Sequence, residues 1–590
     1  MLRAPRAEVG LAFRHLATGE AWTHNDRRFP AGDLVRLPLA LATYKAAADG
    51  QIALSRRVAL GEGGEVTLRD LIRRTLQGED RLAPGLLLDH VSLDDLNRIL
   101  TEWGMARTLL DGPPSDATLH VTTPHEIAGL LARLVHGDDL PPGARQEALS
   151  FMRLARVPAA LRKLSAAAAD PAHLRGVGEG FRHLVFVNQG PGGYLLAILT
   201  EGRIGEAALA KVVATVDSYY RAAHENLGRV QSVLEAERTR LAPDARTVAW
   251  DVKPVWRDGK LELVGRASVP EWPEVVTACR ESSEAPVVDQ VKRLGATPPR
   301  AIALAPVIHL RRGPGHAFEM MSQVVMGTLL DVLEAGEEWW QVRAPDGMIA
   351  WARSTNLQPA TDRDAERWRT REQVLITSPL VTAPRLTHGS VTLSAGTRLA
   401  FVGRRRDDLL GRTPGREEVL LPAAACRHVP ADDGSNPLRA GLSEPTPELL
   451  IRMAHSFLGV PYLWGGTSGW GLDCSGFTQL VFQMAGIQLP RDSDQQLALG
   501  QAHGPVTQVK DLAPGDLVFF KSHVGLFLGR GEFIHASAPA GCVTVNALIP
   551  GAQHYASALA KRFLGGGRVL GASRQASAAE ALDFVPGSPG

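Results

Sequence analysis

The sequence predicts a multidomain α+β protein, and three observations lead to this fold class. The chain has 590 residues, too many for one hydrophobic core, because single cores stop growing near about 250–300 residues. Helical and strand patterns mix in the first part of the chain, whereas the middle consists of short strands separated by turns. The last part combines a helix with two strands that carry a cysteine and two histidines. We therefore expect an N-terminal α/β domain, two small β-barrels and a C-terminal α+β domain.

The expected divisions follow changes in these patterns. They are an N-terminal domain (1–241), a connector with a hairpin and a helix (242–300), two small barrels (301–361 and 370–431), a C-terminal domain (446–571) and a disordered tail (572–590). The polar, turn-rich segment Asp432–Pro437 is predicted to link the second barrel to the C-terminal domain. The apolar residues of 209–223 recur at three- and four-residue spacing, which indicates a helix that docks on a sheet.

Composition excludes several classes of partner. Lysine and arginine number 64 and aspartate and glutamate 63, so the formal net charge is +1 and favours neither nucleic acid nor a membrane surface as a partner. Hydrophobic residues make up 45% of the chain and charged residues 22%, as in ordinary globular proteins. The first residues contain no apolar run of signal-peptide length, and no window approaches the length of a membrane span. We expect a cytoplasmic protein, with secretion or the cell envelope as the alternative; the oligomeric state is not predicted.

Cys474 differs from the other three cysteines. It follows a glycine-rich run, Pro461–Asp473, and begins a predicted helix with an apolar face, so backbone N–H groups and the helix dipole are expected to lower its pKa. Cys279, Cys426 and Cys542 have no such setting and are predicted to be small buried side chains. No Cys-x-x-Cys pair or ligand cluster is visible, and a thiolate with an imidazole needs no metal or cofactor.

Two histidines follow on predicted adjacent strands. His523 begins one strand and His535 lies on the next, across the turn Gly529–Glu532. A cysteine, a histidine and a third polar group are the general arrangement of thiol acyl-transfer enzymes. A one-residue change of register would place one histidine on the other face of the sheet. From the residues alone, a structural role for Cys474 and His523 is therefore as well supported as a catalytic one.

Five runs of residues in order resemble the NlpC-type cell-wall cysteine peptidases, a papain-like family. They are Pro461–Gly476, Leu489–Ser493, Pro514–Phe520, His523–Gly525 and Phe533–Ala536. The resemblance implies that Cys474 is the nucleophile, His523 the base and His535 the group that orients it. It also implies that Tyr462 and the amide of Cys474 stabilise the oxyanion.

The two barrels resemble bacterial SH3 domains, and the order of domains resembles γ-D-glutamyl-L-diamino-acid endopeptidases. The resemblance implies that a free N-terminal L-Ala is read by residues lining the substrate site, namely Asp473, Ser475, Asp492 and Ser493, since carboxylates pair well with ammonium groups. Alternatively, Asp492 and Ser493 cap the next helix. Glu319 is a candidate for an acidic wall. Met348 stands in the Asp-Gly-x-x-x-Trp run where relatives have an aromatic residue, which weighs against a tyrosine contact from this barrel. Its tryptophans Trp339, Trp340 and Trp351 are expected to fill the barrel core rather than to bind ligand.

The N-terminal region resembles class A β-lactamases that have lost their reactive groups. In the run Phe29–Pro38, Asp33 replaces the serine nucleophile and Arg36 the lysine, and a guanidinium cannot act as a base. Of the Ser-Asp-Asn motif only Asp80 remains, and Gly176–Gly180 has no Lys-Thr-Gly. We expect no β-lactam hydrolysis, an ion pair between Asp33 and Arg36, and a scaffold role; retained binding of murein peptides is the alternative.

These features predict a hydrolase that cleaves the γ-D-glutamyl to diamino-acid bond in peptidoglycan stem peptides or muropeptides through a Cys474 acyl-enzyme. Two alternatives remain at this point. The chain could bind peptidoglycan fragments or a partner without catalysis, or the same fold could act as a murein amidase or transferase.

Overall fold

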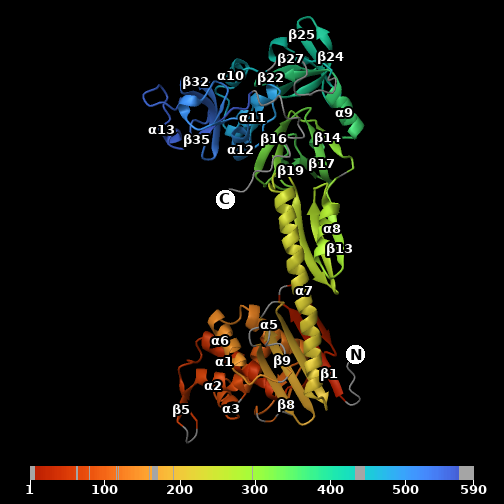
Figure 1. The fold of residues 1–590 in the computed structure, drawn as a ribbon, viewed down its shortest axis with the longest axis vertical. Helices are drawn as coiled ribbons and strands as arrows, with labels where there is room; N and C mark the ends of the chain where they lie inside the picture. The colour runs from red at the N-terminus through yellow and green to blue at the C-terminus, as the bar shows by residue number, and fades with distance from the viewer. Residues whose placement is uncertain are drawn as a thin grey trace. The chain divides into compact units, whose positions relative to one another are not determined.

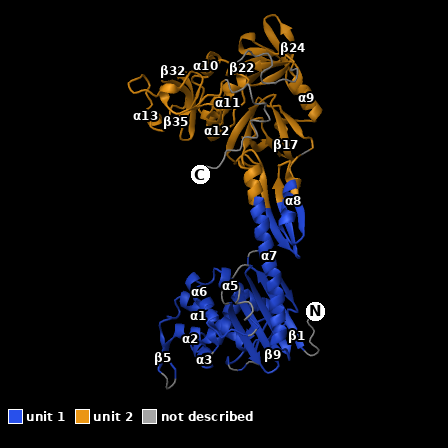
Figure 2. Ribbon diagram, viewed as in Figure 1, with its two compact units in different colours: residues 1–234, 253–264, 274–290 blue, residues 235–252, 265–273, 291–590 orange. Residues whose placement is uncertain are grey.

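A computed structural model of the protein describes residues 7–16, 18–60, 64–78, 80–114, 116, 119–158, 160–161, 171–189, 192–295, 297–431 and 445–570. The predicted linker 432–437 and the predicted tail 572–590 lie outside the described residues. The chain divides into two compact units (Figure 2): residues 1–234, 253–264 and 274–290 form one, and residues 235–252, 265–273 and 291–590 form the other. Within the described residues, every helix is too short or too polar to span a bilayer.

The N-terminal domain is built on a five-stranded antiparallel sheet with the order β2-β1-β10-β9-β8. Its strands are β1 (Ala7–His15), β2 (Ala21–His24), β8 (Ala172–Gly178), β9 (Phe181–Asn188) and β10 (Tyr194–Gly202). Short strands accompany it: β3 (Phe29–Pro30), β4 (Arg57–Ala59), β5 (Glu65–Thr67), β6 (Leu109–Leu110) and β7 (His120–Thr122). All neighbouring strands of this sheet pair in the antiparallel direction.

Helices cover the sheet of this domain (Figure 1). They are α1 (Arg36–Ala48), preceded by the 3-10 turn η1 (Gly32–Val35), α2 (Leu68–Gln77), α3 (Ala83–Leu88), α4 (Leu93–Glu102), α5 (Pro124–His136), α6 (Pro142–Arg153) and α7 (Glu206–Leu241). The predicted apolar face of α7 docks on the sheet, where Tyr220 packs against Phe13 at 4.7 Å between ring centroids. α5 packs on β1, β9 and β10.

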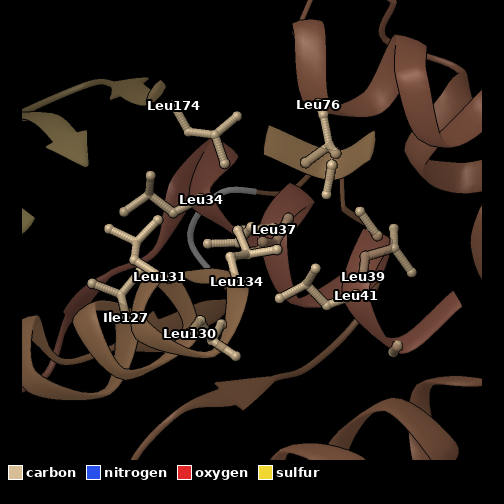
Figure 3. Packing of buried hydrophobic residues seen from close by; sticks show 14 of the residues in the cluster. Leu34, Leu37, Leu39, Leu41, Leu76, Ile127, Leu130, Leu131, Leu134 and Leu174 are labelled. Atoms are coloured by element: carbon tan, nitrogen blue, oxygen red, sulfur yellow. The ribbon is translucent and has the colours of Figure 1, made fainter. Parts of the chain in front are cut away.

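The main core of this domain lies among the helices. Figure 3 shows leucines of η1 and α1 meeting side chains of α2, α5 and β8: Leu34, Leu37, Leu39, Leu41, Leu76, Ile127, Leu130, Leu131, Leu134 and Leu174. All ten are nearly inaccessible to solvent. α1 is apolar on most sides because it is surrounded by other elements, as expected for a central helix.

The segment after α7 contains a three-stranded sheet and one helix. Strands β11 (Trp250–Arg257), β12 (Lys260–Ala267) and β13 (Val287–Arg293) have the order β11-β12-β13, and α8 (Trp272–Ser282) lies between the last two in sequence. The sequence indicated the hairpin and the helix but not β13. Both α7 and this segment contribute residues to each of the two units.

Two small β-domains follow, each with its own core. The first is a seven-stranded sheet of β14 (Arg300–Ala303), β15 (Val307–Arg311), β16 (Met320–Val325), β17 (Leu329–Ala335), β18 (Trp339–Arg343), β19 (Ile349–Arg353) and β20 (Leu357–Ala360). After α9 (Asp362–Thr370), the second contains β21 (Gln373–Ile376), β22 (Leu380–Pro384), β23 (Ser390–Ser394), β24 (Arg398–Arg405), β25 (Asp408–Arg412), β26 (Glu418–Leu421) and β27 (Cys426–Val429). The indole N–H of Trp368 on α9 donates to the carbonyl of Gly327 at 2.9 Å, which joins the two domains.

The C-terminal domain packs helices against a six-stranded antiparallel sheet with the order β30-β35-β31-β32-β33-β34. Its elements are α10 (Pro447–His455), β28 (Thr467–Ser468), β29 (Gly471–Leu472), α11 (Cys474–Met484), α12 (Ser493–His503), β30 (Pro505–Val506), β31 (Leu517–Phe520), β32 (His523–Gly529), β33 (Glu532–Ser537), β34 (Cys542–Ala547), α13 (Ser557–Ala560) and β35 (Phe563–Gly567). The apolar face of α11 forms one core with β31, β32 and β33. This packing brings the start of α11 to the start of β32.

Candidate active site

Cys474 is the first residue of α11, as the sequence predicts. The preceding Asp473 caps the helix, because its carboxylate accepts the N–H of Gly476 at 2.7 Å. The glycine-rich loop before it needs its glycines where it meets the β-domains. A Cβ on Gly465, which has φ 75°, would lie 2.6 Å from the carbonyl oxygen of Met320, and one on Gly469 would lie 1.9 Å from that of Pro379. The loop that delivers the cysteine is thus fitted closely to both β-domains.

Asp473 belongs to a buried ion pair. Its two carboxylate oxygens accept from the guanidinium of Arg491 at 2.5 and 3.1 Å, and one of them also accepts the N–H of Gly465 at 2.9 Å. Arg491 is only 2% exposed and donates further to the hydroxyls of Ser475 and Ser322 at 2.9 and 3.0 Å. Asp473 and Ser475 therefore hold Arg491 and the helix start in place. A direct contact of either with substrate stays a prediction.

The register of β32 and β33 places both histidines on one face of the sheet. Leu526 pairs with Ile534, so His523 and His535 share the opposite face, since side chains alternate along a strand. The Nε2 atom of His523 lies 2.6 Å from the Nδ1 atom of His535. Gly525, between them, has no side chain to separate the rings. The register that the sequence left open therefore favours a histidine pair.

The sulfur of Cys474 lies beside the backbone of the residue that follows His523. It accepts hydrogen bonds from the backbone N–H groups of Ser475 on α11 and of Val524, the residue after His523. Tyr462 lies close enough for the charge of Cys474 and that of Asp473 to act on its hydroxyl, and burial, with these charges, raises the pKa of Tyr462 to about 12. Tyr462 thus lies beside the sulfur as a neutral hydrogen-bond donor.

The prediction that the helix start lowers the pKa of Cys474 is wrong for the protein without substrate. Burial and the neighbouring carboxylate of Asp473 raise the pKa of Cys474 to about 11, and the two backbone N–H groups offset only part of this. Burial, with His535 and Arg562 nearby, lowers the pKa of His523 to about 3. The thiol and the imidazole are therefore both neutral near pH 7, because desolvation outweighs the helix terminus here.

Asn546 on β34 completes the polar row, and sequence reasoning missed it. Its side-chain Oδ1 lies 2.9 Å from Nε2 of His535. β34 pairs with β33, the strand that carries His535. The register of this pair places Asn546 opposite Phe533. The only signal in the sequence is a polar residue two positions after Thr544 in an otherwise apolar strand, and such a residue does not by itself indicate a site.

Asp492 and Ser493 lie at the start of α12, with Asp492 at the helix cap position. The carboxylate of Asp492 pairs with Arg246 at 2.9 Å. Arg246 also reaches Asp494 and Asp244 at 2.8 and 2.7 Å. It comes from the short segment after α7, far away in sequence. Asp492 therefore has the position expected of a helix cap, the alternative to substrate binding. A substrate ammonium group that binds its carboxylate would share that carboxylate with Arg246.

The first β-domain touches the peptidase loop through polar side chains. Glu319 accepts the indole N–H of Trp464 at 3.0 Å and pairs with Arg312 at 2.7 Å, so the candidate acidic wall does lie beside the loop that precedes Cys474. Asp346 accepts from Gln479 on α11 at 3.0 Å. Met348 is 2% exposed and does not project to solvent.

The tryptophans of this β-domain differ in setting. Trp339 is buried, and its ring meets His316 edge to face at 5.0 Å. Trp340 and Trp351 are half-buried, and Trp340 packs against the core and donates to the carbonyl of Gly336 at 2.9 Å. The expectation that the tryptophans fill the core therefore fits Trp340, which packs against the core, whereas Trp339 is buried beside His316 outside that cluster.

In the N-terminal domain, local contacts hold the segment around Asp33 and Arg36. Arg36 donates to Asp33 at 2.8 Å, which confirms the predicted ion pair. The ring of Phe181 packs on Gly32 and on Gly178, so that a Cβ on either would lie 2.5 or 2.2 Å from ring carbons. Asp80 accepts the N–H groups of Leu82 and Ala83 at 2.8 and 3.2 Å. These residues serve packing and capping.

Comparisons with known proteins match three parts of the chain. The model of the NlpC/P60 family matches residues 459–560, that of the bacterial SH3 domain residues 306–358, and that of the β-lactamase enzyme family residues 1–219. These matches confirm the resemblances of the C-terminal domain, the first barrel and the N-terminal region. The resemblance of the second barrel to an SH3 domain stays a prediction. The class of protein defined by the C-terminal domain is a cysteine peptidase.

Individual relatives and one solved structure are similar to parts of the chain. A γ-D-glutamyl-L-lysine dipeptidyl-peptidase of Bacillus cereus is 31% identical over 245 residues, which are 38% of this chain and 68% of the relative. One of the same name from Bacillus subtilis is 40% identical over 99 residues, 15% of this chain and 32% of the relative. A solved NlpC/P60 family protein from Bacillus cereus has a TM-score of 0.40 at 22% identity and covers 46% of this chain and 99% of its own. The chain belongs to the NlpC/P60 family.

Proposed function

We propose that this protein hydrolyses the γ-D-glutamyl to diamino-acid bond of peptidoglycan stem peptides or muropeptides through an acyl-enzyme on Cys474. The observation that carries the proposal is the contact between the start of α11 and the start of β32, where the sulfur of Cys474 accepts the N–H of Val524. His523, directly before Val524, bonds to His535 at 2.6 Å. A thiol beside an oriented imidazole is the arrangement needed for covalent acyl transfer.

The reaction would proceed in two balanced steps. In the first, the sulfur of Cys474 attacks the γ-carbonyl carbon while His523 accepts the thiol proton, and collapse of the tetrahedral intermediate passes that proton to the leaving amine. In the second, water attacks the thioester, gives a proton to His523, and releases the glutamyl carboxylate and the thiol. Tyr462 and the backbone amide of Cys474 would donate hydrogen bonds to the oxyanion in both steps.

The substrate class is supported by the names of the relatives and by the charges near the site. Both Bacillus relatives are named γ-D-glutamyl-L-lysine dipeptidyl-peptidases. Asp492 at the start of α12 and Glu319 on the first β-domain are only partly buried. Carboxylates in such positions favour a substrate with a free ammonium group. We propose that such amine-bearing fragments, rather than intact wall, are the substrate, as expected for cytoplasmic recycling.

The test compares two peptides on three forms of the full chain. L-Ala-γ-D-Glu-diamino-acid peptides with a free or an acetylated N-terminus are incubated with wild type, with Cys474→Ala and with Cys542→Ala, and the products are followed by mass spectrometry. Release of L-Ala-D-Glu from the free peptide by wild type and Cys542→Ala, but not by Cys474→Ala, is expected. Cysteine-dependent cleavage of both peptides would overturn the free-amine preference. Cleavage of neither would overturn the proposed hydrolysis in favour of binding or transfer.

A further inference from the structure

We propose that Asn546 is a positioning residue that fixes which nitrogen of each histidine carries the proton, and thereby presents the bare Nδ1 atom of His523 to Cys474. The inference rests on the proposed function for its use in catalysis. Its evidence lies in a row of hydrogen bonds through β34, β33 and β32. The row begins outside the histidine pair, at a backbone carbonyl.

The orientation of the Asn546 amide is set by His554. The side-chain nitrogen of Asn546 lies 3.0 Å from the carbonyl oxygen of His554, which also accepts the backbone N–H of Ala547 at 3.1 Å. A carbonyl oxygen can only accept, so the NH₂ group of the amide must face it. The amide oxygen of Asn546 then faces His535.

The protons of the two rings follow from this orientation. The Asn546 oxygen only accepts, so Nε2 of His535, at 2.9 Å, must carry a proton. In a neutral imidazole the other nitrogen is then an acceptor. Nδ1 of His535 is therefore bare, and Nε2 of His523, at 2.6 Å, donates to it. Only Nδ1 of His523 remains as a free base.

Both rings are neutral, so the argument from tautomers applies. Burial lowers the pKa of His535 even though Asn546 raises it in part. The titratable groups that shift the pKa of His523 are His535 and Arg562, and the neutral Cys474 thiol contacts the N–H of its neighbour Val524. None of these is an anion at neutral pH that would hold a second proton on His523. The order of protons therefore depends on the single acceptor that Asn546 supplies.

Without the acceptor oxygen of Asn546, the direction of hydrogen-bond donation between the two histidines can reverse. If Nε2 of His535 loses its partner, His535 is free to carry its proton on Nδ1 and donate to His523 instead. His523 would then hold its proton on Nδ1, toward Cys474, and could not accept the proton of the thiol. An apolar residue at position 546 is thus expected to reduce catalysis without changing the reacting residues themselves.

Two substitutions separate positioning from packing. Asn546→Leu removes the acceptor at similar size. Asn546→Asp removes the amide donor to His554 but keeps an oxygen for His535, and its negative charge favours the imidazolium form of both rings. Thr382→Val, at an exposed position of β22 in the second β-domain, is the polar-to-apolar control. Each is made in the full chain and checked by circular dichroism and thermal melting.

The first readout is kcat/KM for the free-amine peptide as a function of pH. We expect Asn546→Leu to lose about 10- to 100-fold, by analogy with the loss of partners that orient metal-bound histidines. Asn546→Asp should retain activity within about tenfold of wild type, with the acidic limb of its profile at higher pH, and Thr382→Val should stay within about twofold. Equal losses in both Asn546 variants without a shift of the limb would overturn the inference, as would wild-type activity in Asn546→Leu.

The second readout needs no substrate. The rate at which iodoacetamide alkylates Cys474 at pH 7 is followed by mass spectrometry of the peptide that contains it. The expected order is Asn546→Asp fastest, wild type next and Asn546→Leu slowest. The same rate in all three would overturn the inference. If wild type cleaves no peptide while this order holds, the proposed substrate is wrong and the role of Asn546 stands.

Discussion

At the scale of single residues, the chemistry of Cys474 is governed by burial. Its sulfur has two backbone donors, yet its pKa is raised to about 11, because removal from water penalises the thiolate and the charge of Asp473 adds to this. The thiol is thus held neutral until a base accepts its proton. The imidazole of His523 is unprotonated near pH 7, because burial and its neighbours lower its pKa to about 3.

The raised pKa predicts the pH dependence of alkylation. A thiol titrates to the thiolate as pH rises through its pKa, so the rate of iodoacetamide labelling at Cys474 should keep increasing between pH 8 and 10. At pH 7 it should be about a hundredfold slower than in the denatured chain, since each pKa unit changes the thiolate fraction about tenfold. Peptide mapping measures both rates, with Cys542 as the internal reference. A plateau below pH 8 would show that a stable thiolate exists in the free protein.

The ion pair of Asp473 and Arg491 predicts an asymmetric effect of substitution. Arg491→Met leaves a buried carboxylate without its partner, which typically costs about 3–5 kcal/mol. The double variant Asp473→Asn with Arg491→Met removes both charges and should recover part of this loss, while the amide still caps α11. Urea denaturation followed by tryptophan fluorescence measures the midpoints. Equal midpoints for the single and double variants would mean that the charge of Asp473 is not what destabilises the single one.

At the scale of elements, the catalytic geometry depends on the pairing of β32 with β33. Gly525 precedes the Leu526–Ile534 pair, and a Cβ there would lie 2.9 Å from Cδ2 of Phe533 and 3.1 Å from Cβ of His535. Both distances are shorter than ordinary carbon contacts, so β33 or the His535 ring must move. The space for the histidine pair is therefore made by the absence of a side chain.

Gly525→Ala should consequently reduce kcat by about 10-fold or more with little change in KM, because small displacements of catalytic groups are costly. Gly403→Ala is the matched control, since Gly403 also lies in a strand but a Cβ there meets no atom within 4 Å. Steady-state kinetics on the free-amine peptide, with melting curves for both variants, make the comparison. Wild-type kcat in Gly525→Ala would show that the His523–His535 bond is not needed.

The sequence predicted those parts of the site that lie in local patterns. Cys474 at a helix start and the two histidines on adjacent strands follow from glycine, turn and apolar spacing. Asn546 and Arg246 could not be found in this way, because their contacts depend on strand register and on packing between distant segments. The pKa of Cys474 was predicted in the wrong direction, because a helix start is readable in sequence but the degree of burial is not.

At the scale of the whole molecule, the peptidase domain does not build its site alone. The first β-domain supplies Ser322 to Arg491 and Gln323 to the loop before Cys474, where the Gln323 side chain accepts from Thr467 and Ser468 at 3.1 and 2.8 Å. The segment after α7 supplies Arg246 to the start of α12. All of these residues belong to one compact unit.

Arg246 is therefore expected to tune affinity from outside the peptidase domain. Its side chain bonds to Asp492 and Asp494, while its carbonyl accepts the N–H of Ile349 at 2.7 Å, which anchors it on the first β-domain. If Asp492 reads the substrate ammonium group, as we propose, the guanidinium competes for that carboxylate. Replacing the guanidinium of Arg246 with a neutral group should then make the site more negative and strengthen binding of an amine.

Arg246→Gln should thus lower KM for the free-amine peptide by about two- to tenfold, the effect of a partly exposed charge, and leave kcat within about twofold. The difference should shrink at high salt, because screening weakens exposed charges. Arg240→Gln, an exposed arginine on α7 that pairs with Glu237, is the control. A higher KM with unchanged melting would mean that Arg246 positions Asp492 for the substrate rather than competing with it, since the guanidinium would then be holding the carboxylate in its binding geometry.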